Sequence, residues 1–332
     1  MAKRPITSIT QIPGVFAAHS TNEQAGTGCT VILCPAGATG GVDVRGGAPA
    51  TRETDLLRPE ETVQILNAVV LSGGSAFGLA ASCGVAEELE RQDIGLDVGV
   101  TKVPIVSGAC VFDLACGSAN VRPTAQDGAA AVRAALANTD GTPLERGNVG
   151  AGTGCTVGKV AGPARSMKSG LGEDVEQAGD LLCGAVSAVN ACGDVVDPET
   201  LSPIAGVLSE DGNGILSTTD MLAGLAARLP LDARSPTPER TNTTISCVVT
   251  NARLTKAQAT KVAQMSADAY AHAIRPTHTT NDGDTIFVMA TGQVDAMPDV
   301  VGVLATRALE RAIVDAARSA TGAYGLKAAC DL

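Results

Sequence analysis

Residues 242–251 read Asn242-Thr243-Thr244-Ile245-Ser246-Cys247-Val248-Val249-Thr250-Asn251. From Thr243 onward, apolar and polar side chains alternate, with Ile245, Cys247 and Val249 on one face of the segment. An alternation with period two and several β-branched residues is typical of a β-strand. We therefore expect a core strand that begins at Thr243, and the rest of the chain is interpreted around it.

The segment before this strand, Ser235-Pro236-Thr237-Pro238-Glu239-Arg240-Thr241-Asn242, is rich in proline and polar residues and predicts an exposed linker. If the Asn242–Thr243 bond breaks, Thr243 becomes an N-terminus. Its α-amino group, with a pKa of about 7.7–8, can then take the proton of its own hydroxyl. The same hydroxyl could first attack the carbonyl of Asn242 and form an ester that water hydrolyses. The hypothesis is a self-cleaving hydrolase that uses Thr243.

Composition limits the possible classes of protein. The 332 residues are 45% hydrophobic and 2% aromatic, which is enough for a core of small aliphatic side chains in one large domain or two ordinary ones. A net charge of −11 argues against nucleic acid or an anionic membrane as a partner. No apolar run approaches the roughly 18 residues of a membrane span, and no secretion signal is expected. The ten cysteines show no C-x-x-C pair, so we expect reduced core thiols, no zinc site and a cytoplasmic location.

Periodicity and glycine or proline punctuation predict the other elements. We expect strands within 8–34, at 42–44, at 67–71, within 102–114, within 183–196 and at 285–289, with a turn at 35–41. We expect helices from the turn at 72–78 to about Arg91, at 127–138, at 218–228, at 255–274 with Thr255 as its N-cap, and from Pro298.

A competing nucleophile lies in Gly73-Gly74-Ser75-Ala76-Phe77, which approaches the G-x-S-x-G elbow of serine hydrolases. Phe77 stands where the second glycine of that motif should be, and the chain has only three histidines. A Ser-His-Asp triad at Ser75 is therefore not favoured. Glycines that let a helix pack closely on a strand explain this stretch better.

A second glycine-rich run extends from Gly147 to Lys159. It matches neither the G-x-G-x-x-G dinucleotide fingerprint nor the Walker pattern, because Val160 follows Lys159. We interpret it as a segment that brings backbone N–H groups and one lysine to a site, although a lone lysine is more often an exposed surface residue.

Three further side chains are candidates for chemistry. Asp282 and Asp284 flank Gly283, so their carboxylates can point to one place and hold an ammonium group; the alternative is a solvated turn. Asn190, near the end of a small-residue strand, could donate to a developing oxyanion or simply cap a turn.

Several segments then resemble a known family. Arg45-Gly46-Gly47-Ala48-Pro49 with Thr51-Arg52-Glu53-Thr54-Asp55, and Leu71-Ser72-Gly73-Gly74-Ser75-Ala76-Phe77-Gly78-Leu79, resemble the self-processing aminopeptidases, which include L-aminopeptidase/D-esterases and β-peptidyl aminopeptidases. Asn242 to Ser246 and His278 to Phe287 are similar to the 6-aminohexanoate-oligomer (nylon oligomer) hydrolase branch. The resemblance spans nearly the whole chain.

The resemblance implies an α/β fold, an αββα four-layer sandwich of the N-terminal-nucleophile-hydrolase type, in a single domain over residues 1–332. It also implies an α fragment, 1–242, and a β fragment, 243–332, which stay associated and assemble as tetramers of the cleaved pair. By motif, the site residues are Thr243 as nucleophile, Lys159 as a catalytic lysine, Asn190 on the oxyanion side, and the acids Asp282 and Asp284. We expect no cofactor and no metal.

The motifs are divided between two branches of that family. Aminopeptidase members often have Ser at the cleavage point, so Thr243 favours the nylon-hydrolase branch, whereas the glycine motifs favour the aminopeptidases. The nylon-hydrolase branch has Tyr where Phe112 stands, so a hydroxyl role is absent there. The expected substrates are short peptides or linear amides, with 6-aminohexanoate oligomers among the candidates. An acyltransferase of the ornithine acetyltransferase type, also cleaved at Thr, and a non-catalytic scaffold that never cleaves are the alternatives.

Overall fold

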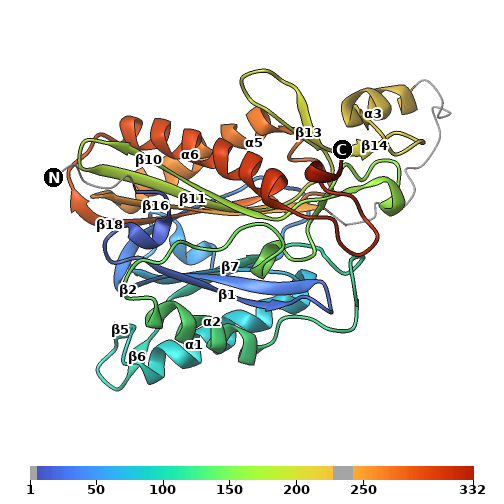
Figure 1. Ribbon diagram of the computed structural model, residues 1–332. Helices are drawn as coiled ribbons and strands as arrows, with labels where there is room; N and C mark the ends of the chain where they lie inside the picture. The colour runs from blue at the N-terminus through green and yellow to red at the C-terminus, as the bar shows by residue number, and fades with distance from the viewer. Residues whose placement is uncertain (1–5, 227–241) are drawn as a thin grey trace.

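The computed structural model describes residues 6–226 and 242–332. Its main sheet is organised around one long strand, β2 (Thr27–Val44). The first half of β2 pairs with β1 (Phe16–Asn22) and β4 (Leu66–Ser72), and its second half pairs with β18 (Thr285–Val294). The strand order is β10-β11-β16-β18-β2-β4-β7-β3, with β1 beside β2. The sheet has one half with β10, β11, β16 and β18 and another half with β1, β4 and β7. Strand β2 belongs to both halves, which stack as two layers (Figure 1).

The other elements have the following bounds. The main sheet also contains β3 (Thr51–Arg52), β7 (Val106–Cys110), β10 (Leu171–Ala178), β11 (Leu181–Asn190) and β16 (Thr243–Ala252). Small separate sheets are formed by β5 (Leu96–Asp97), β6 (Lys102–Val103), β8 (Thr156–Val157), β9 (Met167–Lys168), β12 (Asp194–Val196), β13 (Pro203–Ala205), β14 (Val207–Leu208), β15 (Ile215–Leu216) and β17 (Ile274–Arg275). The helices are α1 (Ala80–Arg91), α2 (Ala125–Ala137), α3 (Thr218–Ala226), α4 (Lys256–Ser266), α5 (Asp268–Ala273) and α6 (Pro298–Ser319).

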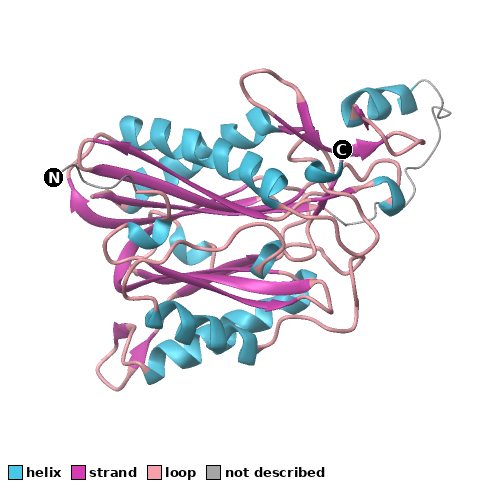
Figure 2. Ribbon diagram, viewed as in Figure 1, coloured by secondary structure: helices cyan, strands magenta, loops and turns pink. Residues whose placement is uncertain are grey.

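Helices cover both outer faces of the two sheet layers (Figure 2). Helices α4 and α6 pack on the layer that contains β10, β11 and β18, and α1 and α2 pack on the layer of β1, β4 and β7. Between the layers lies a dry apolar core that includes Leu71, Val186, Ile245 and Phe287. The predicted αββα sandwich is confirmed.

Local sequence explains where two of the outer helices begin. Thr255 caps α4: its Oγ1 accepts the N–H of Gln258, and Gln258 returns a hydrogen bond by accepting the N–H of Thr255. Pro298 opens α6, where its missing N–H is harmless and its fixed φ suits a helix. The predicted apolar face of α6, which is Val301, Leu304, Ala308 and Ala312, is buried against the sheet.

The structure differs from the sequence prediction at residues 35–41. This segment was expected to turn, but it continues β2 and joins the predicted strand 42–44, with a shift of pairing between Leu33 and Ala38. Its glycines serve close packing: a Cβ on Gly41 would lie 2.4 Å from the backbone of Ala259 in α4. Gly41 therefore marks a helix contact, and Gly37, with φ +84°, adopts positive φ without ending the strand.

The predicted helix over 255–274 is also wrong in one respect, because it is divided into α4 and α5 at Ala267. The hydroxyl of Ser266 donates to the carbonyl of Val262 at 2.8 Å, a contact of the kind that bends helices. The proline-rich run up to Thr241 and the end of the predicted helix 218–228 lie outside the described residues.

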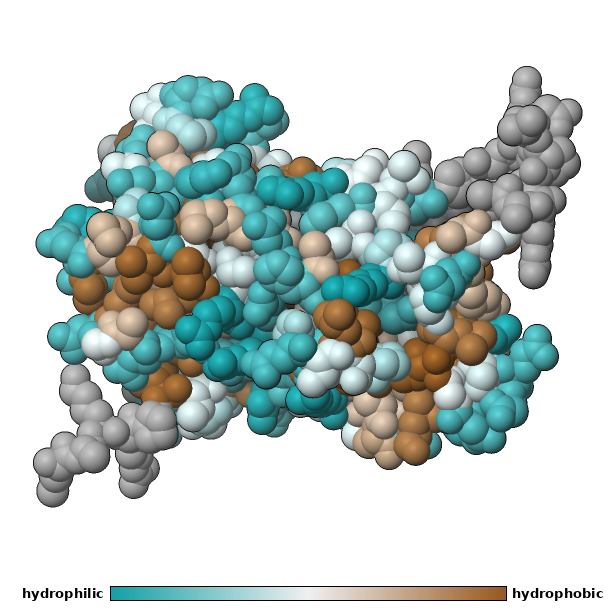
Figure 3. Space-filling view, turned by 90° about the horizontal axis from the view of Figure 1, so that it is seen from above, coloured by the Kyte–Doolittle hydropathy of each residue, from teal (hydrophilic) through white to brown (hydrophobic). Residues whose placement is uncertain are grey.

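The outer surface of the α4–α6 layer is mostly polar, with apolar residues in separate patches (Figure 3). Within residues 6–226 and 242–332, no helix combines the length and the apolar character that a membrane crossing requires. None of the ten cysteines is in a disulfide, and seven of them are buried, as expected for core thiols. The same described residues contain no cluster of three acidic, His or Cys side chains that could hold a metal ion.

Candidate active site

Thr243, the first residue of β16, lies at the same edge of the sheet as the last residue of β11 and the first residue of β18. Strand β11 runs antiparallel to β16, so its last residue, Asn190, pairs with Thr243. Strand β18 runs parallel to β16, and Thr285 at its start pairs with Ile245. The loop before β18 therefore lies beside Thr243. Thr243 is buried, and its Oγ1 donates a hydrogen bond to the carbonyl oxygen of Asn242.

The loop before β18 also contacts the peptide between Asn242 and Thr243. The N–H of Gly283 donates to the carbonyl oxygen of Asn242 at 3.1 Å. A Cβ on Gly283 would lie 2.8 Å from Thr243 Oγ1, so this close approach suits a glycine. An N–H group directed at a carbonyl oxygen stabilises the negative charge that develops when the carbonyl carbon is attacked.

Asp284 ties this loop to the start of β16. Its Oδ1 accepts the N–H of Thr244 at 2.7 Å, and its Oδ2 accepts the N–H of His278 at 3.1 Å and lies 2.9 Å from His278 Nδ1. The His278 ring stacks on Tyr270, whose hydroxyl donates to the carbonyl of Thr244. Asp284 is 2% exposed, so the solvated turn considered as an alternative is wrong for this residue.

Asp282 is 1% exposed and points its carboxylate into the same region. Its Oδ2 accepts the N–H of Thr279 at 2.7 Å, whereas its Oδ1 has no hydrogen-bond partner among the described residues. Burial and the nearby charge of Asp284 raise the pKa of Asp282 to about 6, against the opposing effects of Thr279 and the positive charge of Lys159. The pKa of this acid is therefore well above that of an ordinary aspartate.

Lys159 reaches the site from the end of the glycine-rich run. Its Nζ donates to the backbone carbonyl of Asn190 at 2.9 Å and to the side-chain Oδ1 of Asn190 at 2.8 Å. Burial lowers the pKa of Lys159 to about 8, although the negative charge of Asp282 and nearby thiols oppose that effect. The interpretation of Lys159 as an ordinary surface lysine is therefore wrong, because its ammonium group is held against Asn190.

Asn190 is hydrogen-bonded at both ends of its side-chain amide. Its Oδ1 accepts from the N–H of Thr156 at 3.0 Å as well as from Lys159, and its Nδ2 donates to the carbonyl of Phe112 at 2.8 Å. These contacts fix which end of the amide faces which neighbour. Asn190, the residue that pairs with Thr243, thus connects Lys159 to the start of β16.

The segment Arg45–Pro49 packs against the loop before β18, on residues 280–284. The N–H of Ala48 donates to the carbonyl of Asp282 at 2.8 Å, and the N–H of Arg45 donates to the carbonyl of Asp284 at 3.0 Å. A Cβ on Gly46 would lie 2.3 Å from the Asp282 carbonyl oxygen, so a side chain there would displace the loop. The Gly-Gly-Ala-Pro motif therefore positions the two acids.

Ser75, the competing nucleophile, lies in a different setting. It has φ +54° at the start of a short 3₁₀ helix, and its N–H donates to the carbonyl of Val111. The three histidines form their hydrogen bonds elsewhere: His19 with Thr30 and Glu145, His272 with Glu310, and His278 with Asp284. The described residues therefore provide no Ser-His pair at Ser75.

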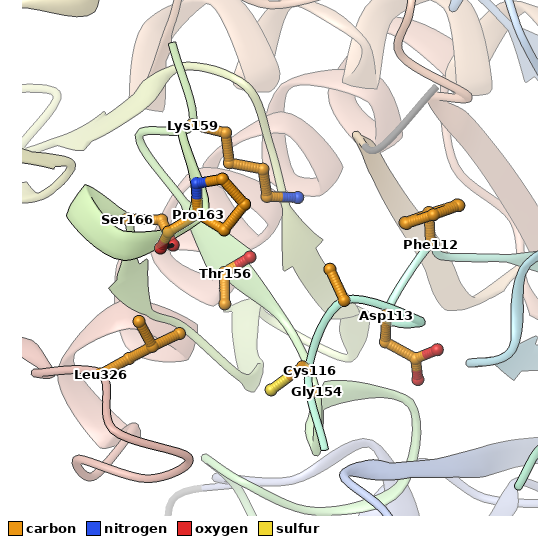
Figure 4. Close-up of a pocket in the computed structure, with 10 residues that line it drawn as sticks. Phe112, Asp113, Cys116, Gly154, Thr156, Lys159, Pro163, Ser166 and Leu326 are labelled. Carbon is orange, nitrogen blue, oxygen red and sulfur yellow. Dashed lines mark hydrogen bonds between the residues drawn. The ribbon is translucent and has the colours of Figure 1, made fainter. Parts of the chain in front are cut away.

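A narrow pocket of about 50 Å³ opens beside Lys159, which is enough room for a few water molecules. Phe112, Cys116, Pro163 and Leu326 supply much of its lining. Figure 4 shows the amino end of Lys159 pointing across the pocket toward Phe112, and the carboxylate of Asp113 turned away from Lys159. The pocket is thus mainly apolar, with one amine at its edge.

The structure brings together all five side chains singled out from the sequence, together with Asn242. Sequence reasoning missed the backbone N–H of Gly283 and the pair formed by His278 and Tyr270. The Asp-Gly-Asp spacing was the available signal for Gly283, because glycine is the residue that permits such a close backbone approach. Nothing local marks Tyr270, which reaches the site only through the packing of α5.

Comparison with known proteins identifies the class. The model of peptidase family S58 matches residues 7–329, so this chain belongs to that family and is a hydrolase. The L-aminopeptidase D-Ala-esterase/amidase of Ochrobactrum anthropi, described as a variant of the Ntn hydrolase fold, superimposes with a TM-score of 0.65. The match is 18% identical and covers 96% of this chain and 89% of the other, which supports the fold.

Two curated relatives refine this placement. An uncharacterized aminopeptidase of Mycobacterium leprae is 38% identical, with 99% of this chain and 94% of the relative covered. The 6-aminohexanoate-oligomer endohydrolase of Paenarthrobacter ureafaciens is 30% identical, with 85% of this chain and 74% of the relative covered. The resemblance to the self-processing aminopeptidases and their nylon-oligomer branch is confirmed.

Proposed function

We propose that this chain cleaves itself between Asn242 and Thr243 and then hydrolyses amides with Thr243 as the nucleophile. The observation that carries the proposal is the geometry at that peptide. The Thr243 hydroxyl lies against the carbonyl of Asn242, and the oxygen of this carbonyl already accepts the N–H of Gly283. Nucleophile, electrophile and oxyanion donor are therefore held together before any bond breaks.

Self-cleavage begins when Thr243 Oγ attacks the carbonyl carbon of Asn242. Negative charge forms on the Asn242 oxygen and is stabilised by the Gly283 N–H. The carbon–nitrogen bond then breaks, and the proton lost by the hydroxyl ends on the departing amine of Thr243. Neutral Lys159, with its pKa of about 8, is the group that takes up and passes on this proton. Water hydrolyses the resulting ester, which gives a carboxylate on Asn242 and regenerates the Thr243 hydroxyl.

The same groups serve the hydrolysis of substrate. The new α-amino group of Thr243 takes the hydroxyl proton, and the oxygen attacks the substrate amide to form an acyl-enzyme while the substrate amine departs with a proton. Water then releases the acyl group. Asp282, with one carboxylate oxygen unpartnered among the described residues, holds the amine of Thr243 in its ammonium form between these steps.

The substrates we propose are short peptides and linear amides, including 6-aminohexanoate oligomers. An aminopeptidase and an endohydrolase of such oligomers are both among the curated relatives. Residues 1–242 and 243–332 remain together after cleavage as one domain, because β16 and β18 of the second fragment lie between β11 and β2 of the first. Removing the second fragment would open the middle of the sheet.

Intact mass under denaturing conditions tests the cleavage. We expect two polypeptides that meet between Asn242 and Thr243, with a summed mass one water greater than that of the whole chain. The purified protein should also release amine from short peptides. A folded chain that stays whole after prolonged incubation near pH 8 would contradict the proposal.

A further inference from the structure

Lys168, in β9, is completely buried, and this burial lowers the pKa of its ammonium group. Its Nζ donates to three backbone carbonyls: those of Thr153 at 3.0 Å, Cys155 at 2.7 Å and Ser169 at 2.9 Å. An ammonium group has three donors, so these contacts use all of them. Lysine is among the residues least often buried completely. Lys168 binds the backbone of the segment that leads to Lys159.

One of these contacts leads directly to the proposed active site. The peptide between Cys155 and Thr156 accepts from Lys168 through its carbonyl and donates through its N–H to Asn190 Oδ1 at 3.0 Å. The same Oδ1 accepts from Lys159 Nζ at 2.8 Å. A positive charge on the carbonyl side of a peptide polarises it and makes its N–H a stronger donor. Lys168 thus acts on Asn190 through one peptide unit.

The backbone of the same segment is held at its start by other groups. The N–H of Gly150 donates to Thr21 and the N–H of Ala151 donates to Thr30, both in the β1–β2 hairpin. Lys168 holds the centre of the segment, from Thr153 to Cys155, at the point where it turns toward Asn190. Lys168 therefore contacts the part of this segment that donates to Asn190, whereas the hairpin contacts only the part before it.

We propose that Lys168 is a positioning residue for the reaction: by holding the carbonyls of Thr153 and Cys155 it sets the amide of Asn190 and, through it, the amine of Lys159 opposite Thr243. This proposal rests on the proposed function, because it gives Lys168 a part in the same chemistry. Without Lys168, the Thr156 N–H and Asn190 Oδ1 shift, and Lys159 loses the two oxygens that hold its ammonium form.

The chain offers a matched control in Lys256. This lysine is 4% exposed and also donates to three backbone carbonyls, those of Leu56, Glu61 and Val63, at 2.9–3.0 Å. It follows the far end of β16, about 30 Å from Thr243 along a strand of this length. Replacing either lysine with Met removes the same charge and the same number of hydrogen bonds, but only one replacement affects the site.

The test compares Lys168→Met with Lys256→Met in the full chain. Self-cleavage is followed from freshly synthesised precursor by gel and intact mass, and kcat and KM are measured on matured protein with a short peptide amide. We expect Lys168→Met to slow self-cleavage and lower kcat by about 10-fold or more, with little change in KM. Lys168→Arg, which keeps the charge and the donors, should recover part of the rate.

The pH profile separates positioning from simple stabilisation. Lys159 faces Asp282 and the thiols of Cys116, Cys155 and Cys192, and none of these side chains is replaced in the variant. Loss of the Asn190 oxygens should therefore move the midpoint of the rate profile to lower pH, by about half a unit or more. Lys256→Met should lower the melting temperature to a similar extent and leave the rate and the midpoint unchanged.

Each outcome decides the proposal. If Lys168→Met loses only thermal stability, as Lys256→Met does, Lys168 is a structural lysine and the inference is wrong. If Lys168→Met does not fold, Lys168→Gln takes its place with the same two measurements, and an unchanged rate and midpoint overturn the inference. Failure of the wild-type chain to cleave or to hydrolyse amides would instead overturn the proposed function.

Discussion

Two regions of the molecule place a hydroxyl residue at the end of a buried strand beside glycines, and only one of them gathers the groups of the proposed active site. At the start of β16, Thr243 is buried, and the carbonyl before it accepts the N–H of Gly283. Asn190, which pairs with Thr243, accepts a hydrogen bond from the amine of Lys159. After β4, Ser75 follows two glycines and is half-buried. A strand–glycine–hydroxyl pattern alone therefore does not identify a nucleophile, because a base and an oxyanion donor must also lie beside the hydroxyl.

The glycines of the Ser75 turn have a structural explanation. A Cβ on Gly73 would lie 2.0 Å from Asp113 Oδ2 and 2.4 Å from Thr27 Oγ1. Asp113 fills that space with its carboxylate, which accepts from Thr27 Oγ1 and from the N–H of Gly74, both at 2.6 Å. The glycines therefore leave room for the carboxylate of Asp113, whose hydrogen bonds stabilise the turn. Ser75 is the next residue in the sequence and has no part in these contacts.

The largest effect should come from removing the hydroxyl of Thr243, and removal of the hydroxyl of Ser75 is its control. Thr243→Ala should abolish self-cleavage and reduce amide hydrolysis by about 10⁴-fold or more, because the nucleophile is lost. Ser75→Ala should cleave and turn over like the wild-type chain, and Thr243→Ser, which keeps a hydroxyl, should still cleave. Intact mass and initial rates measure both. Hydrolysis by an uncleaved Thr243→Ala protein, or its loss in Ser75→Ala, would reverse the comparison.

A smaller effect is expected from crowding Thr243 without removing any reacting group. In Gly283→Ala the new Cβ would lie 2.8 Å from Thr243 Oγ1 and 3.2 Å from Thr243 Cγ2, while the Gly283 N–H is retained. Displacement of a nucleophile by a fraction of an ångström to about 1 Å can slow a reaction about 10²-fold, so we expect self-cleavage to slow on that scale.

Gly224→Ala is the control for this substitution. Gly224 lies in α3, where a Cβ meets open space, so the variant should cleave at the wild-type rate. Time courses of precursor loss measure both variants. Equal rates for Gly283→Ala and the wild type would mean that the loop before β18 does not position the nucleophile.

The third prediction concerns pH. Asp282 raises the pKa of Lys159 by its negative charge, while burial lowers that pKa to about 8. If neutral Lys159 takes the proton of Thr243, self-cleavage should speed up as pH rises to about 8. Asp282→Asn removes the negative charge, so the pKa of Lys159 falls and the midpoint should move down by about half to one unit.

Asp194→Asn provides the comparison for the pH profile. Asp194 is also buried, but it accepts from Thr218 at the start of α3 and from Val207 in β14, and its charge is not among those that shift the pKa of Lys159. Its profile should match that of the wild type. A midpoint that stays fixed or rises in Asp282→Asn would show that Lys159 is not the group that titrates.

Local pattern was sufficient for most elements, because period-two and period-3.6 alternation depend only on neighbouring residues. The strand at 243–252, the helix capped by Thr255 and the helix opened by Pro298 all follow from such patterns. The turn predicted at 35–41 failed because glycine has two uses, positive φ and close packing. Only the position of α4 over Gly41 distinguishes them, and that is a long-range contact.

The residues of the site also depend on long-range contacts that the local sequence does not reveal. Asp282 and Asp284 could be named from their spacing, but their burial could not, because it comes from the Arg45–Pro49 segment far away in sequence. Lys159 has the local sequence of a surface lysine, and only its tertiary contact with Asn190, at the end of β11, holds its amine in the site. Chemistry-bearing residue types are visible locally; the contacts that change their pKa values are tertiary.

The smallest predicted effect is a loss of stability when Asp113, beside the Ser75 turn, is replaced. Asp113→Asn keeps the size of the side chain but cannot accept from both Gly74 and Thr27, so we expect a loss of about 1 kcal/mol in the free energy of unfolding. Self-cleavage should be unchanged, since the carboxylate turns away from Lys159 (Figure 4). Denaturant unfolding and precursor time courses measure the two quantities.

The pH dependence of that loss has a definite sign. Burial raises the pKa of Asp113 above its ordinary value, so the folded chain binds this proton more tightly than the unfolded chain. The stability that Asp113 contributes is therefore fully present below the ordinary carboxyl pKa of about 4 and declines as pH rises through the folded value. The difference between wild type and Asp113→Asn should be larger at acid pH than at pH 8. A difference that grows with pH would mean that folding lowers the pKa of Asp113 instead of raising it. A cleavage defect in this variant would mean that the acid beside Ser75 takes part in chemistry after all.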